Sequence, residues 1–252
     1  MRYLSRVASS LADKLGYMVL PKWRLDDYPL ERHLRHLFQV LRIETVLDVG
    51  ANAGQYGKFL RHRVGFEGHI HSFEPLEGPA QALRASAKAD RRWHVHQCAL
   101  GMADGTLTIN VTNRDTFSSF LRPSVQPGSR FAASVTVTRT EAVSVRSLDS
   151  LWDGLGRNPT TCYLKVDTQG YDLRVLGGGL GLLQHLPALQ FEWAIQPIYE
   201  GTASYLDALK QLNDWGFTLS GLFPVSMHDN MAAIEFDCVM VSNRPTPSSP
   251  LA

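Results

Sequence analysis

Two acidic residues, Asp48 and Glu74, each end an apolar stretch, and a glycine-rich segment lies between them. The sequence VLDVGANAGQYG (46–57) reads as a buried strand that turns through glycines into a helix. Gly50 and Gly54 would let the backbone approach a bound molecule closely. In doubly wound folds, an acid at the end of the second strand, here Glu74, accepts hydrogen bonds from ribose hydroxyl groups. This spacing predicts a nucleotide-cofactor loop.

A second set of polar residues lies where a proton could be taken from a substrate. Asp167 closes the strand CYLKVD (162–167), which is expected across the crevice from the glycine loop. As a general base, Asp167 would accept the proton of a hydroxyl group. Lys165 is predicted on the same face of that strand, so Asp167 could equally be an ion-pair partner or a cofactor ligand. Both roles stay open.

Two other residues could serve the same chemistry. Glu192 ends the next strand at the same edge of the sheet and could position or deprotonate the substrate. His228, in a loop before the last strand, is an alternative base. Two carboxylates do not by themselves make a metal site, and we predict no metal.

The remaining histidine and cysteine patterns are expected to be structural. Four histidines fall near the starts of two neighbouring strands, where packing is the simpler role: His69, His71, His94 and His96. The three cysteines lack C-x-x-C spacing and are expected to be buried thiols in a reducing compartment: Cys98, Cys162 and Cys238.

Hydrophobic periodicity predicts the elements that must place these residues. Strands are expected at 46–48, 69–73, 93–98, 162–167, 189–192, 217–222 and 234–241. Helices are expected at 4–18, at 30–41 and at 203–215. Three more are expected: one that begins at about 55, one that ends at about 88, and one from 171 to the glycines at 177–179. Their alternation predicts an α/β fold with a mostly parallel sheet.

Composition and segment boundaries predict one main domain. The 252 residues include 44% apolar and 19% charged side chains, enough to bury a full core. We expect a helical extension or lid at 1–42 and an α/β domain at 43–243, with a hairpin-like insertion at 105–147 and a disordered tail at 244–252. The amphipathic helix at 4–18 would cover the domain or its site, or contact a membrane surface weakly.

Charge and hydropathy exclude several classes of protein. The formal charge of +1 offers no field to attract nucleic acid, so we predict no such partner. No apolar run is long enough to span a bilayer, and the N-terminus lacks the pattern of a cleaved signal peptide. We therefore expect a cytoplasmic protein.

Three kinds of cofactor loop can be compared with this sequence. A triphosphate loop would need a Lys–Ser/Thr pair, but Lys58 is followed by Phe59. A dinucleotide fingerprint lacks its first glycine, since position 52 is Asn, and no Tyr-x-x-x-Lys pair occurs; an NAD(P)-dependent oxidoreductase is kept as an alternative. A methyl donor, S-adenosylmethionine, needs a short glycine loop with acids after the first two strands, which Asp48 and Glu74 supply.

Five motifs in order resemble the FkbM-type methyltransferases: V-L-D-V-G-A-N-x-G, S-F-E-P, C-A-L-G, F-S-S-F and L-K-V-D-x-Q-G-Y-D, between residues 46 and 172. The similarity extends to about residue 216, and it departs from the family pattern mildly at Thr168 and Asp172. The resemblance implies a class I methyltransferase (Rossmann-like) three-layer fold, with a seven-stranded mostly parallel sheet and an antiparallel last strand. It also implies S-adenosylmethionine as cofactor and O-methylation of a hydroxyl group.

The sequence pattern and the resemblance together predict two groups of site residues. Cofactor contacts are expected from Asp48, Gly50, Ala51, Asn52, Gly54, Tyr56, Glu74, Ala99, Leu100 and Asp167. Substrate contacts are expected from Ser118, Ser119, Gln169, Glu192 and Tyr199. The expected acceptor is a small molecule or a sugar of a glycolipid, polysaccharide or natural product. A cofactor-binding pseudoenzyme or scaffold is the non-enzymatic alternative.

Overall fold

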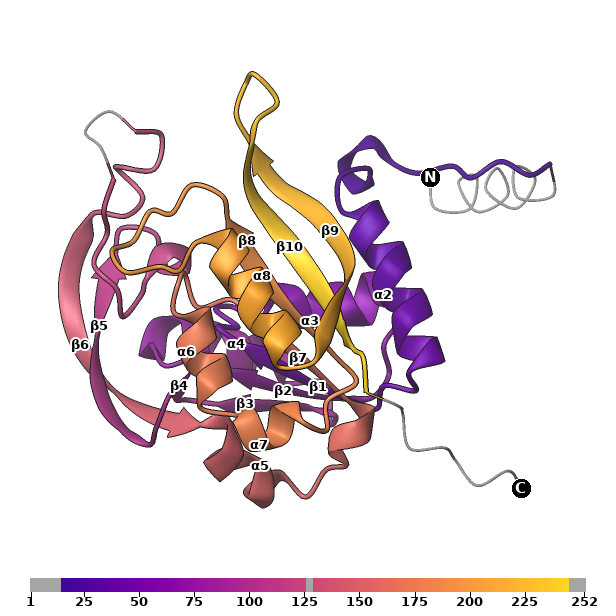
Figure 1. The fold of residues 1–252 in the computed structure, drawn as a ribbon, viewed down its shortest axis with the longest axis horizontal. Helices are drawn as coiled ribbons and strands as arrows, with labels where there is room; N and C mark the ends of the chain where they lie inside the picture. The colour runs from indigo at the N-terminus through magenta and orange to yellow at the C-terminus, as the bar shows by residue number, and fades with distance from the viewer. Residues whose placement is uncertain (1–14, 126–128, 245–252) are drawn as a thin grey trace.

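The computed structural model describes residues 15–125 and 129–244 (Figure 1). The strands of the larger sheet are β1 (Thr45–Val49), β2 (His69–Phe73), β3 (Trp93–His96), β7 (Cys162–Val166), β8 (Ala188–Ala194), β9 (Phe217–Met227) and β10 (Ala233–Ser242). A smaller sheet contains β4 (Ala99–Gly101), β5 (Gly105–Thr112) and β6 (Val137–Ser147). The α-helices are α2 (Tyr28–Val40), α3 (Gln55–Phe59), α4 (Glu77–Ala87), α5 (Leu148–Leu155), α6 (Asp172–Gly177), α7 (Leu180–Leu183) and α8 (Tyr205–Asp214).

The larger sheet has seven strands in the order β3-β2-β1-β7-β8-β10-β9. The pairs from β3 to β8 are all parallel. β10 pairs antiparallel with both β8 and β9, so it runs against the other six strands of this sheet. This is the class I methyltransferase topology, and the predicted fold, including the antiparallel last strand, is confirmed.

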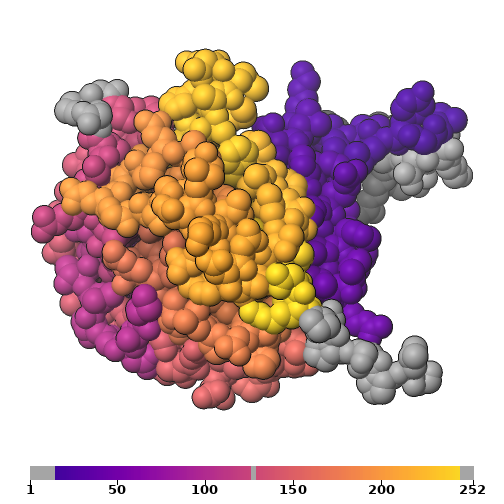
Figure 2. Space-filling model, viewed as in Figure 1, coloured from indigo at the N-terminus to yellow at the C-terminus, as the bar shows by residue number. Residues whose placement is uncertain are grey.

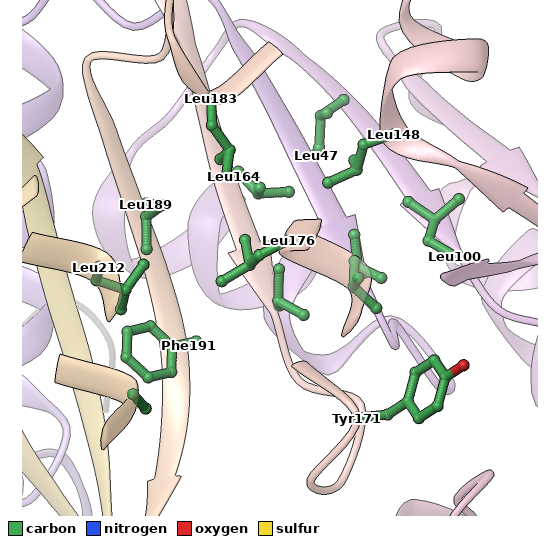
Figure 3. Packing of buried hydrophobic residues seen from close by; sticks show 14 of the residues in the cluster. Leu47, Leu100, Leu148, Leu164, Tyr171, Leu176, Leu183, Leu189, Phe191 and Leu212 are labelled. Atoms are coloured by element: carbon green, nitrogen blue, oxygen red, sulfur yellow. The ribbon is translucent and has the colours of Figure 1, made fainter. Parts of the chain in front are cut away.

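Apolar side chains on both faces of the sheet bury it between helices. Alternate residues of β7 point to opposite faces, so Leu164 joins one core and Tyr163 the other. Figure 3 shows the first core, where Leu164 packs with Leu176 of α6 and Phe191 of β8. The second core includes Leu83 of α4. Burial on both faces explains why these strands read as continuous apolar runs.

The segment between β3 and β7 forms the smaller sheet. β5 and β6 pair antiparallel, and β4 adds to β6 in parallel. The Ser119 hydroxyl donates a 2.8 Å hydrogen bond to the carbonyl oxygen of Gln169, and Pro123 pairs with Tyr199. The chain between β5 and β6 is therefore held against the loops that follow β7 and β8. The domain boundaries expected from the sequence remain predictions.

Three sequence predictions need correction. The strand expected at 93–98 ends at His96, and residues 99–101 form β4 in the other sheet. Helix α5 was not predicted; it begins after Ser147, whose hydroxyl accepts a hydrogen bond from the backbone N–H of Ser150. The strand expected at 217–222 continues to Met227.

The N-terminal part of the described chain packs beside the sheet edge. α2 lies alongside β9 (Figures 1 and 2), where the rings of His33 and Phe223 pack at a tilt of 54° with centroids 5.2 Å apart. Residues 1–14 of the helix predicted at 4–18 lie outside the described residues, as does the tail from 245. That helix does not extend to Met18, because Leu15 lies in a turn and Met18 has no regular structure. Within residues 15–125 and 129–244, no helix is long and apolar enough to cross a membrane.

Candidate active site

A cavity of about 510 Å³ lies at the carboxyl ends of the central strands. Gly50 follows β1, Glu74 follows β2, Asp167 follows β7, and Glu192 comes from β8; all four line the cavity. The insertion closes another side through Ser118 and its neighbours. In doubly wound folds, ligands bind at this edge, where neighbouring strands send their connections to opposite faces.

The glycine loop is shaped by packing against the protein itself. Gly50 has a φ of 76°, and a Cβ atom there would lie 1.9 Å from the carbonyl oxygen of Asp167. At Gly54, with a φ of 84°, a Cβ atom would lie 2.9 Å from Leu83 and 3.1 Å from the ring of Trp93. We predicted these glycines for close approach to a ligand. Within the protein, the contacts that require them are with the end of β7 and the Trp93 side chain. Gly50 also lines the cavity, whereas Gly54 does not, and contact of either glycine with a ligand stays a prediction.

Glu74 presents a buried carboxyl group to the cavity and is 6% exposed. Its two oxygens accept hydrogen bonds from the backbone N–H groups of Asn52, at 3.0 Å, and Leu76, at 2.9 Å. Burial raises the pKa of Glu74 to about 7, although these two hydrogen bonds lower it. A carboxylate has about four lone-pair positions, so room remains for ligand hydroxyl groups.

Asp48 lies beneath the cavity, not in its wall. It is fully buried, and its Oδ2 accepts a 2.9 Å hydrogen bond from Ser72. Its Oδ1 lies 3.6 Å from Lys165 Nζ and has no hydrogen-bond partner among the described residues. Burial raises the pKa of Asp48, while the Lys165 charge opposes that shift. We predicted direct contact with the cofactor, but Asp48 does not line the cavity, whereas its neighbour Lys165 does.

Lys165 joins the carboxylates of β1 and β7. Its Nζ lies 3.2 Å from Asp167 Oδ2 and 5.1 Å from the centre of the Tyr56 ring. Burial acts to lower the pKa of Lys165, but the negative charges of Asp167 and Asp48 outweigh it and raise the pKa. Lys165 is therefore a retained positive charge at the floor of the cavity. The ion pair, one of the two roles left open for Asp167, is present.

Gln169 connects the two carboxylates at the other side of the cavity. It adopts a φ of 54°, and its Nε2 donates to Asp167 Oδ1 at 3.0 Å and lies 3.5 Å from Glu192 Oε1. Burial raises the pKa of Glu192 well above its ordinary value, and the charges of Asp167 and Glu235 act in the same direction. Glu192 is thus a poorly solvated carboxyl group close to a second acid.

The structure brings most of the predicted site residues to one cavity. Its wall contains Gly50, Ala51, Asn52, Tyr56, Glu74, Ala99, Leu100, Ser118, Ser119, Asp167, Gln169 and Glu192. Tyr199 lies elsewhere: its hydroxyl donates to the carbonyl oxygen of Phe117 at 2.6 Å, and its side chain lines a smaller neighbouring cavity. The roles of these residues remain predictions.

His228 is not brought to either cavity. It lies in the turn between β9 and β10, where its Nε2 is 3.1 Å from Gln196 Oε1. That hairpin projects from the body of the protein (Figure 1, yellow). The prediction of His228 as an alternative base is therefore wrong on geometric grounds.

A polar network in the cavity was missed by the sequence analysis. Tyr56 donates a 2.7 Å hydrogen bond to Gln190 Oε1, and Gln190 Nε2 donates at 2.7 Å to Asp237. Burial raises the pKa of Asp237 to about 6. Gln190 could have been noticed, because it alternates with Glu192 along the strand. Asp237 faces Glu192 through the β8–β10 register, which the sequence does not reveal.

The four histidines form a stack across β2 and β3. His69 Nδ1 lies 3.2 Å from His94 Nε2, and His71 Nδ1 lies 3.1 Å from His96 Nε2. Burial and the neighbouring histidines lower the pKa of His71 to about 3. No group of three or more potential metal ligands is found in the part of the chain that the structure describes.

Comparison with known proteins identifies the family. The model of the methyltransferase FkbM domain matches residues 48–219. No curated protein sequence matches the chain. Among solved structures, a SAM-dependent methyltransferase from Aquifex aeolicus is similar at 16% identity and a TM-score of 0.42, covering 92% of this chain and 98% of that one. A putative O-methyltransferase from Klebsiella pneumoniae is similar at 11% identity and a TM-score of 0.47, covering 96% and 90%.

A third similar structure is magnesium protoporphyrin IX methyltransferase from Synechocystis PCC 6803 with bound SAM, at 11% identity and a TM-score of 0.46, covering 87% of this chain and 81% of that one. Similarity at this level says nothing about a substrate. The family match covers more than half of the chain and includes the glycine loop, Glu74 and the Asp167–Glu192 pair. The chain therefore belongs to the FkbM methyltransferase domain family, and its cofactor is S-adenosylmethionine.

Proposed function

We propose that this protein is an S-adenosylmethionine-dependent O-methyltransferase that methylates a hydroxyl group of a sugar in a glycolipid, polysaccharide or natural product. The observation that carries the proposal is the pairing of two functions in one cavity. Glu74 offers a carboxylate suited to ribose hydroxyl groups, and Asp167, Gln169 and Glu192 offer a carboxyl cluster suited to an acceptor hydroxyl.

The chain's own residues fit the cofactor. Ribose hydroxyl groups would donate to Glu74, which keeps lone pairs available beside Asn52 and Leu76. Lys165 would attract the carboxylate of the methionine moiety, since its charge lies in the cavity wall. When bound, S-adenosylmethionine supplies an electrophilic methyl group with a good leaving group.

Glu192 is the proposed general base. Among the described residues, its carboxylate makes a long polar contact, 3.5 Å to Gln169 Nε2, so its lone pairs are available to an acceptor hydroxyl. Its raised pKa brings its basicity closer to that of a hydroxyl group than an ordinary carboxylate allows. Asp167, whose two oxygens already accept from Lys165 and Gln169, is proposed to fix these two side chains in place.

The experiment that tests this function measures S-adenosylhomocysteine formation by mass spectrometry. The purified protein is incubated with S-adenosylmethionine and a panel of glycosides and glycolipids, and products are mapped for the methylated atom. Transfer to a hydroxyl oxygen of a sugar supports the proposal. Transfer to nitrogen or carbon contradicts it, and cofactor binding without turnover across the panel supports a pseudoenzyme. A cytoplasmic location and contact with a membrane surface stay predictions from the sequence.

A further inference from the structure

A second, smaller cavity adjoins the cofactor cavity and has no role in the function proposed so far. It measures about 180 Å³ and is lined by residues of β8, the following loop and α8, among them Phe191, Trp193, Tyr199, Thr202 and Ala208. We call it the Trp193 cavity. Gln169 and Glu192 line both cavities, so these two side chains stand at their junction.

Trp193 gives this cavity an unmet hydrogen-bonding requirement. The residue is 7% exposed, and its buried indole N–H has no acceptor among residues 15–125 and 129–244. A buried donor without a partner costs about 1–3 kcal/mol. Most buried polar groups in native structures are paired with a protein group or an ordered water, so an unpaired one needs an explanation. Because the indole ring lines the cavity, a rotation of the ring would turn this N–H towards an oxygen atom of a ligand bound there.

We propose that the Trp193 cavity binds the sugar ring of the methyl acceptor, a neutral pyranose, and presents its hydroxyl group to Glu192. This inference rests on the proposed function, because it assumes that the acceptor is a sugar hydroxyl. It adds the place where the ring binds and the residue, Trp193, that recognises it.

The size and walls of the cavity suit one six-membered ring. An apolar cavity of about 150 Å³ is large enough to bind benzene. Phe191 and Trp193 pack edge to face with centroids 4.9 Å apart, which places aromatic surface in the wall for the C–H faces of a sugar. A second ring would exceed the space that is available.

The polar groups around the cavity favour a ligand with several hydroxyl groups over a ligand with one. Besides the Trp193 side chain, the polar residues of the wall include Gln169, Asp172, Arg174, Thr202 and Glu235. Glu235 already accepts a 2.7 Å hydrogen bond from Ser226, and burial raises the pKa of its carboxyl group. A phenol has one hydroxyl group and would leave most of these side chains unpaired, whereas a pyranose can pair with several. Three acidic side chains line the cavity, Asp172, Glu192 and Glu235, against one cation, Arg174, and this excess of acids disfavours an anionic ligand.

The position of Glu192 at the junction of the two cavities fits the role of proton acceptor. Glu192 lines both cavities, so a hydroxyl group of a ring in the Trp193 cavity would meet both Glu192 and the cofactor cavity at their junction. Glu192 would take the proton as the C–O bond to the transferred methyl group forms. The sulfonium bond breaks to release S-adenosylhomocysteine, so atoms and charge balance without another reactant.

The test uses the five tryptophans as reporters. In full-length protein with ¹⁵N-labelled indole groups and saturating S-adenosylhomocysteine, the Trp193 signal is assigned by its loss in Trp193→Phe. Methyl α-D-glucopyranoside, its manno and galacto isomers, and phenol are then titrated separately. We expect at least one pyranoside to shift the Trp193 signal, and Trp193→Phe to weaken its binding about five- to tenfold.

A matched control is Trp152→Phe, because Trp152 packs partly buried on the same core but lines neither cavity. This variant should leave pyranoside binding unchanged. Three results would overturn the inference: no pyranoside shifts the Trp193 signal, only phenol does, or binding responds to Asp237→Asn in the cofactor cavity and not to Trp193→Phe. Calorimetry with S-adenosylhomocysteine distinguishes failure of this inference from failure of the proposed function. Loss of sugar binding with intact cofactor binding would contradict the inference, whereas absence of cofactor binding would contradict the proposed function.

Discussion

The carboxylate of Glu74 accepts a 3.0 Å hydrogen bond from the backbone N–H of Asn52 and thereby ties the end of β2 to the glycine loop after β1. The same carboxyl group faces the cavity, and its pKa of about 7 makes it sensitive to pH in the neutral range. A group that both shapes the loop and offers oxygens to a ligand links cofactor affinity to its own ionisation.

Cofactor affinity should therefore fall at acid pH. In the proposed function, ribose hydroxyl groups would donate to the ionised carboxylate, so binding would favour deprotonated Glu74. Below about pH 7, the dissociation constant of S-adenosylhomocysteine should rise about tenfold per pH unit, and above pH 8 it should level off. Calorimetry from pH 5.5 to 8.5 measures this. Glu74→Gln should bind more weakly and lose the pH dependence; a parallel slope in that variant would assign the titration to another group.

The stability of the cofactor-free protein should show the opposite trend. The folded-state pKa of Glu74 is raised from 4.5 to about 7, so between these values the unfolded chain releases a proton that the folded protein retains. The free energy of unfolding that Glu74 contributes is therefore present below about pH 4.5 and is lost as pH rises through 7. In urea unfolding, the free energy of unfolding of the wild-type protein, compared with that of Glu74→Gln, should fall by about 3 kcal/mol between pH 4.5 and 8. A constant difference between the two proteins would contradict the raised pKa.

Replacement of the two carboxyl groups should separate their roles. Glu192→Gln should lower kcat about 100-fold or more with unchanged cofactor affinity, because it removes the proposed proton acceptor. In the wild type, the rise of kcat with pH should occur above the range of an ordinary glutamate, since the pKa of Glu192 is raised, and it should vanish in the variant.

Asp167→Asn is the comparison variant. In the proposed mechanism Asp167 positions Lys165 and Gln169 and does not accept the proton, so this variant should lose less than about tenfold in kcat. If Asp167→Asn instead loses 100-fold and Glu192→Gln does not, Asp167 is the base.

The sequence predicted the sheet and twelve of the residues that line the cavity, because both follow from local pattern. Alternation along a strand places Lys165 and Asp167 on one face, and parallel strands bring Asp167 and Glu192 to one edge. Contacts between segments that are distant in the sequence could not be predicted from local pattern. The reason for Gly54, for example, is the Trp93 side chain, which comes from β3.

His228 shows how a strand boundary decides a functional prediction. A short strand ending near Leu222 would have left His228 on a loop over the site. The strand continues through Pro224 to Met227, which is tolerated because β9 is an edge strand and its proline need not donate to a neighbour on the open side. The longer hairpin carries His228 away from both cavities.

Lys165 should contribute strongly to the stability of the folded protein, in addition to lining the cavity. Lys165→Met removes the positive charge beside buried Asp48, whose Oδ1 would keep no compensating neighbour. Loss of one partner of a buried ion pair costs about 3–5 kcal/mol. The double variant Lys165→Met/Asp48→Asn should recover much of this loss in urea unfolding at pH 7. Additive effects of the two substitutions would show that Lys165 and Asp48 do not interact energetically.

A substitution in the glycine loop should test whether packing against β7 fixes its shape. Gly50→Ala combines a positive φ of 76° with a Cβ atom 1.9 Å from the Asp167 carbonyl oxygen, so the loop must move from the end of β7. We expect a loss of at least about 2 kcal/mol in the free energy of unfolding and weaker cofactor binding. Gly78→Ala is the matched control, because a Cβ atom there meets nothing within 4 Å and the residue lies in α4. That change should stabilise the protein by up to about 1 kcal/mol. Equal effects at the two positions would mean that the close contact between the Gly50 loop and Asp167 is relaxed in solution.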